Sequence, residues 1–349
     1  MQQILKSSYL TKVILHEFEK RMLYQNNSFA VSQSIQFSKA ACQVLNTLVY
    51  FDVFHYPLTD VEIFERSSIG NLNQTQEALK ELIANDAIFF INGFYCLHNN
   101  KSLIERRLKG NKHAEKSLNI AKRITRIIKL FPYVRAVMLS GSISKNYMEK
   151  NSDIDYFIIT ATNRLWVCRL FFVLVQKIIF FNRYKYFCYN YMVDENHVAI
   201  TDQSFYTAIE ASSLLPVYNF EMYQQFRQSN LWMQAYFPNF PMEEKVLLNN
   251  KRSWIQIVLE IVFNNSFGEW LDKCLMKKIE AKWHRRHEPK MFAGTKNLQL
   301  KRHTAKAHTE GHYNRIMDLY TAKKTEYEER FKIIFSEKTH LITPIKINA

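Results

Sequence analysis

The segment from Leu139 to Thr160, LSGSISKNYMEKNSDIDYFIIT, combines a small-residue turn with two closely spaced carboxylates. Asp153 and Asp155 are separated by one residue, so in a strand both side chains would emerge on the same face. Two such carboxylates repel each other and are tolerated when a cation lies between them. Magnesium accepts oxygen ligands and leaves further positions to water and substrate phosphates. We therefore expect Asp153 and Asp155 to bind Mg²⁺ or Mn²⁺, the alternative being an exposed start of a strand.

The turn that precedes the two aspartates has the residue types of an anion site. Gly141 lets the backbone approach a phosphate without a Cβ clash, and the Ser142 hydroxyl can donate a hydrogen bond. The start of a following helix would add free N–H groups, and Lys145 lies close enough in sequence to offset negative charge. These three residues predict phosphate binding, although Ser142 taken alone could equally be a helix N-cap.

The order of strand, Gly-Ser turn, short helix, strand and Asp-x-Asp resembles the DNA polymerase beta-like nucleotidyltransferase superfamily, in particular its small bacterial members. The resemblance covers roughly Tyr133 to Asp202. It implies transfer of a nucleotidyl group from a nucleoside triphosphate, ATP among the candidates, to an acceptor hydroxyl with Mg²⁺ as cofactor. The positions that match the family's phosphate turn and metal ligands are Gly141, Ser142, Lys145, Asp153 and Asp155.

Two departures from the family pattern bear on activity. Asn146 stands where minimal members often have glycine, and the strand YFCYNYMVDE carries Asn190 where the family places a third carboxylate. Asn190 could still bind a metal weakly through its carbonyl, but asparagine contributes no charge and takes no proton. Activity would therefore be reduced, would use Asp194 or Glu195 instead, or would be absent with nucleotide binding retained. Two hypotheses follow. The chain is a metal-dependent nucleotidyltransferase, or it is a catalytically impaired nucleotide-binding or regulatory protein that retains the fold.

The elements around these residues predict an α+β protein in which a nucleotidyltransferase-fold mixed sheet is flanked by an N-terminal winged-helix-like module and a C-terminal helical domain. The core spans 131–203 and holds the strands VRAVMLS and DIDYFIIT, an apolar helix over 164–181, and a hairpin of YKYFCYNYMV with HVAIT. Residues 204–349 read almost entirely as helix.

The N-terminal part is expected to contain a helix over 1–34, a module over 35–100 and a connecting basic helix over 101–130. Three helices and a hairpin at Asn92-Gly93 are the order of a winged helix. The third helix, however, offers one cation, Lys80, beside several acidic residues, and phosphate attraction supplies most non-specific DNA affinity. A packing or protein-contact role is therefore favoured over DNA reading.

Positive charge is concentrated toward the C-terminus, where residues 271–349 contain eighteen basic and nine acidic residues. Nucleic acid is a candidate partner for this part. The segment RHTAKAH, Arg302 to His308, has the loose Arg-His spacing of helical ribonucleases that accompany small nucleotidyltransferases, but a solvated basic loop is favoured. The aromatic residues Trp254, Phe263, Phe267 and Trp270 are expected in a helix core rather than in a base-stacking surface.

Five scattered cysteines argue against a disulfide framework and a zinc site, and thus favour a reducing cytoplasm. The most apolar segment, RLWVCRLFFVLVQKIIFF, is interrupted by Arg169, Gln176 and Lys177, so we expect a buried helix and no transmembrane segment.

Overall fold

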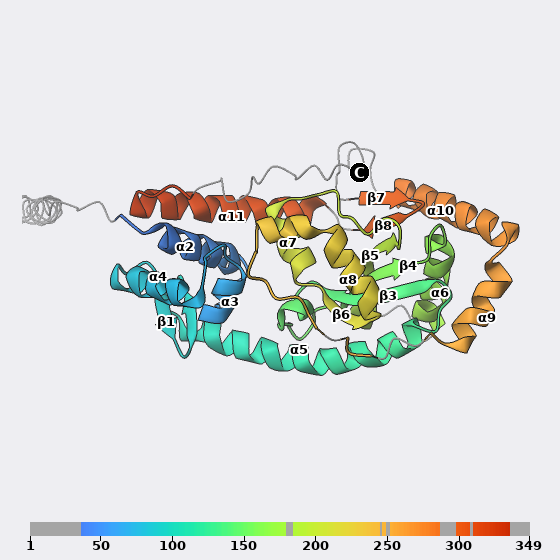
Figure 1. Cartoon of the computed structure of the whole chain (residues 1–349), viewed down its shortest axis with the longest axis horizontal. Coiled ribbons are helices and arrows are strands. Elements are labelled where there is room, and N and C mark those ends of the chain that lie inside the picture. Colours follow the sequence, from blue (N-terminus) through green and yellow to red (C-terminus); the bar gives the residue numbers. More distant parts are fainter. Residues whose placement is uncertain are drawn as a thin grey trace, which may run out of the picture.

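The computed structural model describes residues 36–178, 184–244, 246–248, 252–286, 298–307 and 310–335. The helix expected over 1–34 lies outside these residues. The described chain forms an α+β fold with one six-stranded mixed sheet and about ten helices, so the predicted fold class is confirmed at this level. In Figure 1 the N-terminal module lies at one end of the elongated molecule and the sheet lies toward the other.

The N-terminal module has three helices and a hairpin in the predicted order. Its elements are α2 (Lys39–Asp52), α3 (Asp60–Glu65), α4 (Leu72–Ala84), β1 (Phe89–Ile91) and β2 (Phe94–Cys96). Thr59 and Glu62 form a reciprocal capping box that fixes the start of α3. Asn92 and Gly93 both adopt positive φ, as the two-residue turn of this hairpin requires.

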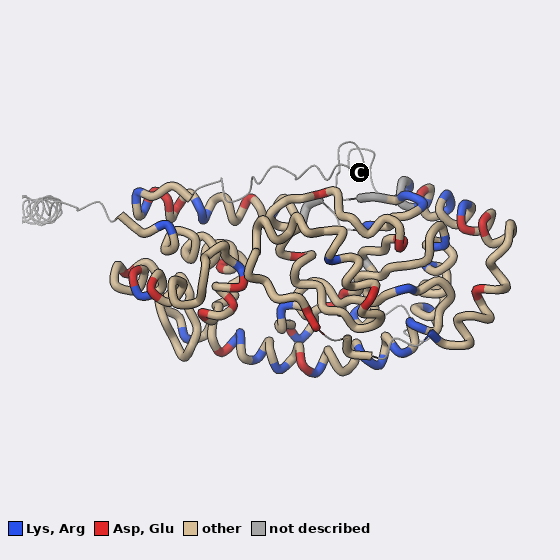
Figure 2. The backbone as a smooth tube through the Cα atoms, viewed as in Figure 1, with Lys and Arg blue, Asp and Glu red and all other residues tan. Residues whose placement is uncertain are grey.

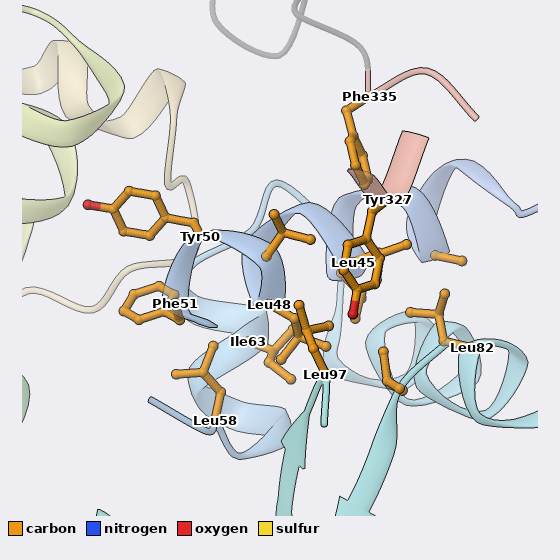
Figure 3. Packing of buried hydrophobic residues seen from close by; sticks show 14 of the residues in the cluster. Leu45, Leu48, Tyr50, Phe51, Leu58, Ile63, Leu82, Leu97, Tyr327 and Phe335 are labelled. Atoms are coloured by element: carbon orange, nitrogen blue, oxygen red, sulfur yellow. The ribbon is translucent and has the colours of Figure 1, made fainter. Parts of the chain in front are cut away.

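The last described helix of the chain, α11 (Glu310–Phe331), completes the core of this module. Tyr327 of α11 lies in the same buried cluster as Leu45 and Leu48 of α2 (Figure 3). The Tyr320 hydroxyl donates to Asn46 Oδ1 at 2.6 Å. The hydrophobic core of the N-terminal module therefore includes side chains from α11, a helix near the other end of the sequence.

Helix α5 (Lys101–Ile128) joins the module to the sheet and runs along the lower edge of the molecule in Figure 1. It occupies the range in which the connecting basic helix is expected. A Cβ at Gly110 of this helix would lie 2.2 Å from the Tyr147 ring, and the Gly110 carbonyl accepts from Met148 N at 3.1 Å. Glycine at this position therefore lets α5 pack directly on the segment that follows the Gly-Ser turn.

The sheet has the strand order β6-β3-β4-β5-β8-β7. Its strands are β3 (Val134–Ser140), β4 (Asp155–Thr160), β5 (Cys188–Asp194), β6 (Leu215–Tyr218), β7 (Leu298–Lys301) and β8 (Thr304–Ala307). Strands β4 and β5 are parallel and are joined by a crossover through α6 (Leu165–Ile178), whereas the other neighbouring pairs are antiparallel.

Helices cover both faces of this sheet. One face packs with α5, α6 and α10 (Ser266–Arg286) around a core that includes Trp166 and Phe172. The other packs with α7 (Phe205–Ser212) and α8 (Phe220–Ser229) around Phe157 and Phe226. Among the described residues, no helix is long and apolar enough to cross a membrane.

Two predictions about the second half of the chain are wrong. The segment HVAIT forms no strand, and β5 instead pairs with β8. Residues 204–349 are not helical throughout, because they supply β6, β7 and β8 to the central sheet. The segment Arg302–Ala307, expected as a solvated loop, forms the turn and second strand of the β7–β8 hairpin. These short strands are stabilised by partners far away in sequence, which local periodicity does not reveal.

The prediction of an aromatic helix core near residue 260 is also largely wrong. In α9 (Trp254–Phe263) and the start of α10, Trp254, Phe267 and Trp270 are each more than half exposed. Phe263 does pack, with its ring centroid 6.0 Å from that of Phe171. A helical period identifies a helix face but does not say whether that face points toward the core.

Candidate active-site cleft

The Gly-Ser turn and the second aspartate lie against each other. Ser140 at the end of β3 pairs with Asp155 at the start of β4, and Gly141 follows with φ +67°. A Cβ at Gly141 would lie 2.6 Å from Asp155 Oδ2, closer than real Cβ contacts allow. Position 141 therefore needs glycine both for its left-handed backbone and for the space that the carboxylate occupies.

The turn continues into the short 3-10 helix η2 (Ile143–Lys145), which ends at Asn146. Asn146 has φ 54° and ψ 38°, the left-handed conformation that asparagine tolerates better than most residues. Asparagine at this position thus adopts a backbone conformation that glycine would also allow. The Ser144 hydroxyl donates to the Gly141 carbonyl at 2.9 Å and stabilises the turn from within.

Lys145 bridges the turn and helix α7. Its Nζ lies 3.1 Å from the Gly141 carbonyl oxygen and 2.9 Å from Glu210 Oε2. Its backbone carbonyl accepts from the Tyr56 hydroxyl at 2.6 Å, so the N-terminal module also contacts the turn. Lys145 therefore lies beside the Gly-Ser turn, as its position in the sequence predicted.

These residues line a cleft of about 710 Å³ between the N-terminal module and the sheet. Gly141, Ser142, Lys145 and Asp155 contribute to one wall. The residues that line it from helices α2, α5, α7 and α11, the α2–α3 turn and strand β8 include Tyr50, Tyr56, Arg106, Tyr206, Glu210, Lys306, Tyr313 and Arg315. The cleft is large enough for a nucleotide-sized ligand.

The carboxyl group of Asp155 has a raised pKa in this cleft. Burial raises its pKa from 3.8 to about 6, and the negative charges of Asp153 and Glu210 raise it further, while a hydrogen bond with the Cys188 side chain and the charge of Lys145 lower it. A carboxylate whose ionised form is disfavoured in this way is stabilised by an added cation. The burial and the neighbouring negative charges that raise the pKa of Asp155 are therefore compatible with cation binding at this carboxylate.

Asp153 lies two residues before β4, and its side chain is exposed. It is near enough to act on the pKa of Asp155, but it does not line the cleft as Asp155 does. Strand β4 begins only at Asp155, but Ile154 is buried and hydrogen-bonds with the backbone of Lys185 and Cys188, so a shared face for the two aspartates stays a prediction. Asp153 would approach a cation from the rim of the cleft.

The structure does not bring Asp194 or Glu195 to the cleft. Asp155 pairs with Cys188 at the start of β5, whereas Asp194 is the last residue of that strand. Asp194 is six residue steps along the strand from Cys188, which is about 20 Å. Neither Asp194 nor Glu195 can therefore supply the third carboxylate.

The contacts of Asp194 give it a structural role. The side chain is fully buried, and its carboxylate lies 2.6 Å from His197 Nδ1 and accepts from the backbone N–H groups of Asn163 and Asn196. Glu195 forms an ion pair with Arg135 at 3.5 Å. Asn190 belongs to β5, but its side chain lies outside what the structure describes.

Glu210 is a cleft residue that the sequence does not predict. It projects from α7 into the cleft, is ion-paired to Lys145, and raises the pKa of Asp155. Nothing in its local sequence, FYTAIEASSLL, distinguishes it from an acidic residue on an exposed helix face. Only the packing of α7 against the turn assigns it to the site.

The carboxylates of Asp153 and Asp155 fit a hard cation that takes most of its ligands from substrate phosphates and water. Among the described residues, no three His, Cys, Asp or Glu side chains form a metal-binding group. Asp155 and Asp153 offer carboxylate oxygens, and the Gly141 backbone leaves room at the carboxylate that a larger residue would fill. Mg²⁺ commonly binds through one or two carboxylates together with substrate phosphates and water.

Comparison with protein-family models, curated proteins and solved structures finds no match to this chain. The resemblance to nucleotidyltransferases remains an inference from the residues of the turn and the carboxylates.

Proposed function

We propose that the protein transfers a nucleotidyl group from a nucleoside triphosphate to an acceptor hydroxyl in a reaction that depends on Mg²⁺ or Mn²⁺. The observation that supports this most is the contact between the Gly141 backbone and the Asp155 carboxylate at the wall of a nucleotide-sized cleft. A polyphosphate beside that turn would lie next to the carboxylate. The assignments of the sheet to the nucleotidyltransferase fold and of residues 35–100 to a winged-helix-like module belong to the same proposal.

Each cleft residue has a distinct role in this proposal. Asp155 and Asp153 would hold the divalent cation, which when bound supplies positive charge that offsets the triphosphate and acidifies the attacking hydroxyl. Ser142 donates its hydroxyl, and Lys145 its ammonium, to phosphate oxygens. Glu210 keeps the Lys145 side chain extended across the turn before the nucleotide enters.

The acceptor would approach from the wall formed by β8 and α11. Lys306 and Arg315 line the cleft there, and both belong to the basic C-terminal part of the chain. An acceptor that carries negative charge, such as a nucleic acid, suits this wall. All five cysteines are free thiols, which supports the cytoplasm as the proposed location.

A second candidate function is nucleotide binding without transfer. It is favoured by the strand beside Asp155, where the paired residue is Cys188 rather than a carboxylate. A cysteine there leaves the described cleft with no third carboxylate on β5 to activate the hydroxyl.

The two functions separate in one assay. The protein is mixed with radiolabelled ATP, GTP, CTP or UTP and Mg²⁺ or Mn²⁺, and label is sought on the protein, on added RNA and in pyrophosphate. Transfer that disappears in both Asp153→Asn and Asp155→Asn supports the leading proposal. Nucleotide binding with no transfer under any condition supports the second function instead.

A further inference from the structure

Helix α9 is oriented with its polar side chains toward the protein. Gln256 is fully buried, and its Nε2 donates to the Val134 carbonyl at 2.7 Å. One turn later, Glu260 accepts from Arg135 and from the backbone N–H of Tyr133, both at 2.8 Å. These buried polar contacts fix the rotation of the helix about its axis, so the side that faces outward is set by the fold.

The outward side of α9 is apolar. The large apolar residues of α9 that are more than one-third exposed are Trp254, Ile255, Ile257, Val258, Ile261 and Val262. Trp254 is 73% exposed and Ile261 is 70% exposed. A soluble surface helix normally shows the reverse pattern, with its apolar stripe against the core. Contiguous exposed apolar residues of this kind mark an interaction surface.

The surface continues onto α10 and there becomes basic. Phe267 and Trp270 are exposed, and Lys273 and Lys277 follow at intervals of three and four residues, which places the four side chains along one helix face. Further along α10, Lys278, Lys282 and Arg285 are also exposed. The α9 sequence WIQIVLEIVF contains no Lys or Arg. Figure 2 shows Lys and Arg recurring along α10, with acidic residues between them.

We propose that α9 and the first half of α10 dock on an anionic phospholipid surface. An interfacial helix inserts an apolar face to the depth of the lipid headgroups, places Trp and Phe at that level, and sets Lys and Arg beside anionic lipids. Each of these features is present here.

Vesicle flotation tests this inference, and its outcome does not depend on the nucleotidyl-transfer proposal. Wild-type protein is expected to float with vesicles of equimolar phosphatidylcholine and phosphatidylserine and to float much less with phosphatidylcholine alone. Binding to the anionic vesicles should weaken as salt is raised, because the attraction of the lysines to the headgroups is screened.

Two pairs of variants separate the apolar from the charged part of the surface. Ile257→Ser with Ile261→Ser should weaken vesicle binding about a hundredfold, since two exposed isoleucines no longer enter the lipid. The matched control is Leu108→Ser with Leu319→Ser, which changes exposed leucines on α5 and α11 and should leave binding unchanged.

For the charged part, Lys277→Glu with Lys278→Glu should weaken binding to the anionic vesicles at least about tenfold. Lys112→Glu with Lys116→Glu, exposed on α5, is the matched control. All variants change exposed side chains, and equal thermal unfolding midpoints would show that each is folded.

Three results would overturn the inference. The first is the absence of wild-type binding to anionic vesicles. The second is equal loss in the α9 variant and its leucine control. The third is a wild-type dimer in analytical ultracentrifugation that becomes a monomer on Ile257→Ser with Ile261→Ser, which would assign the surface to a second copy of the chain.

Discussion

The two ends of the β4–β5 pair both carry an aspartate, but the surroundings of the two carboxylates differ. Asp155 lies against the Gly141 turn at a cleft, beside other acidic groups, and burial raises its pKa to about 6. Asp194 is fully buried at the other end of the pair, and its oxygens are satisfied by a histidine and two backbone N–H groups. A carboxylate that the protein has supplied with donors stabilises the fold. At Asp155, burial and the charges of Asp153 and Glu210 raise the pKa despite a hydrogen bond with Cys188 and the charge of Lys145, and an added cation would stabilise the ionised carboxylate.

The largest expected effect concerns activity at the cleft. Asp155→Asn should lower nucleotidyl transfer at least about a thousandfold, because the carboxylate that would hold the cation is lost. Asp194→Asn should leave the rate per folded molecule within about threefold, since Asp194 lies about 20 Å away along the strand. Rates are measured with the labelled nucleotide that the wild type uses. Equal losses in both variants would remove the distinction between the two carboxylates.

The next effect is on stability at the other end of the strand pair. Asp194→Ala should lower the free energy of unfolding by about 2 to 4 kcal/mol, because buried donors at Asn163, Asn196 and His197 lose their acceptor. Urea unfolding measures the change. A loss below about 0.5 kcal/mol would mean that Asp194 is not the structural carboxylate described here.

A glycine substitution tests the close approach at the turn. Gly141→Ala should cost about 1 to 2 kcal/mol of stability for its positive φ, and in addition lower nucleotide affinity, because the new Cβ meets Asp155 Oδ2. Gly93→Ala is the matched control, since Gly93 has φ +86° but no atom within 4 Å of an added Cβ. Gly93→Ala should lower stability through its positive φ and leave nucleotide affinity unchanged. Equal nucleotide affinity in the two variants would argue against a role for the Gly141–Asp155 contact in nucleotide binding.

The smallest effect is a pH-dependent gain in stability. With chelator present at pH 7, Asp155→Asn should raise the free energy of unfolding by about 1 to 2 kcal/mol, because the native wild type must ionise a carboxyl whose pKa is raised. As pH falls from about 6 through 3.8, the native wild type takes up a proton that the unfolded chain does not yet bind. The wild type then gains stability relative to the variant, and the gap should close below pH of about 4. If the difference in free energy of unfolding between the variant and the wild type widens as pH falls, the pKa of Asp155 is lowered in the native state and not raised.

The sequence was most informative where local chemistry decides structure. The Asn92-Gly93 turn and the long helix from Lys101 both occur where the residues predict them. The contact of Gly141 with Asp155 could likewise be inferred, because the turn and the strand are close together in the chain.

The features that could not be predicted depend on distant partners. Glu210 enters the cleft because α7 packs on the turn, and β8 is a strand because β5 accepts it. The outward apolar face of α9 follows from two polar residues that hydrogen-bond to the start of β3. Neither residue is marked by local periodicity.

The central claim is that the Asp155 carboxylate and the Gly141 turn together bind a divalent cation with a polyphosphate. Isothermal titration calorimetry with a non-hydrolysable ATP analogue tests it directly, using wild type, Asp155→Asn and Asp194→Asn with Mg²⁺ and with chelator. We predict that wild type and Asp194→Asn bind the analogue only when Mg²⁺ is present and that Asp155→Asn does not bind. Binding that is equally strong in Asp155→Asn, or that is unaffected by removing Mg²⁺, would contradict the account.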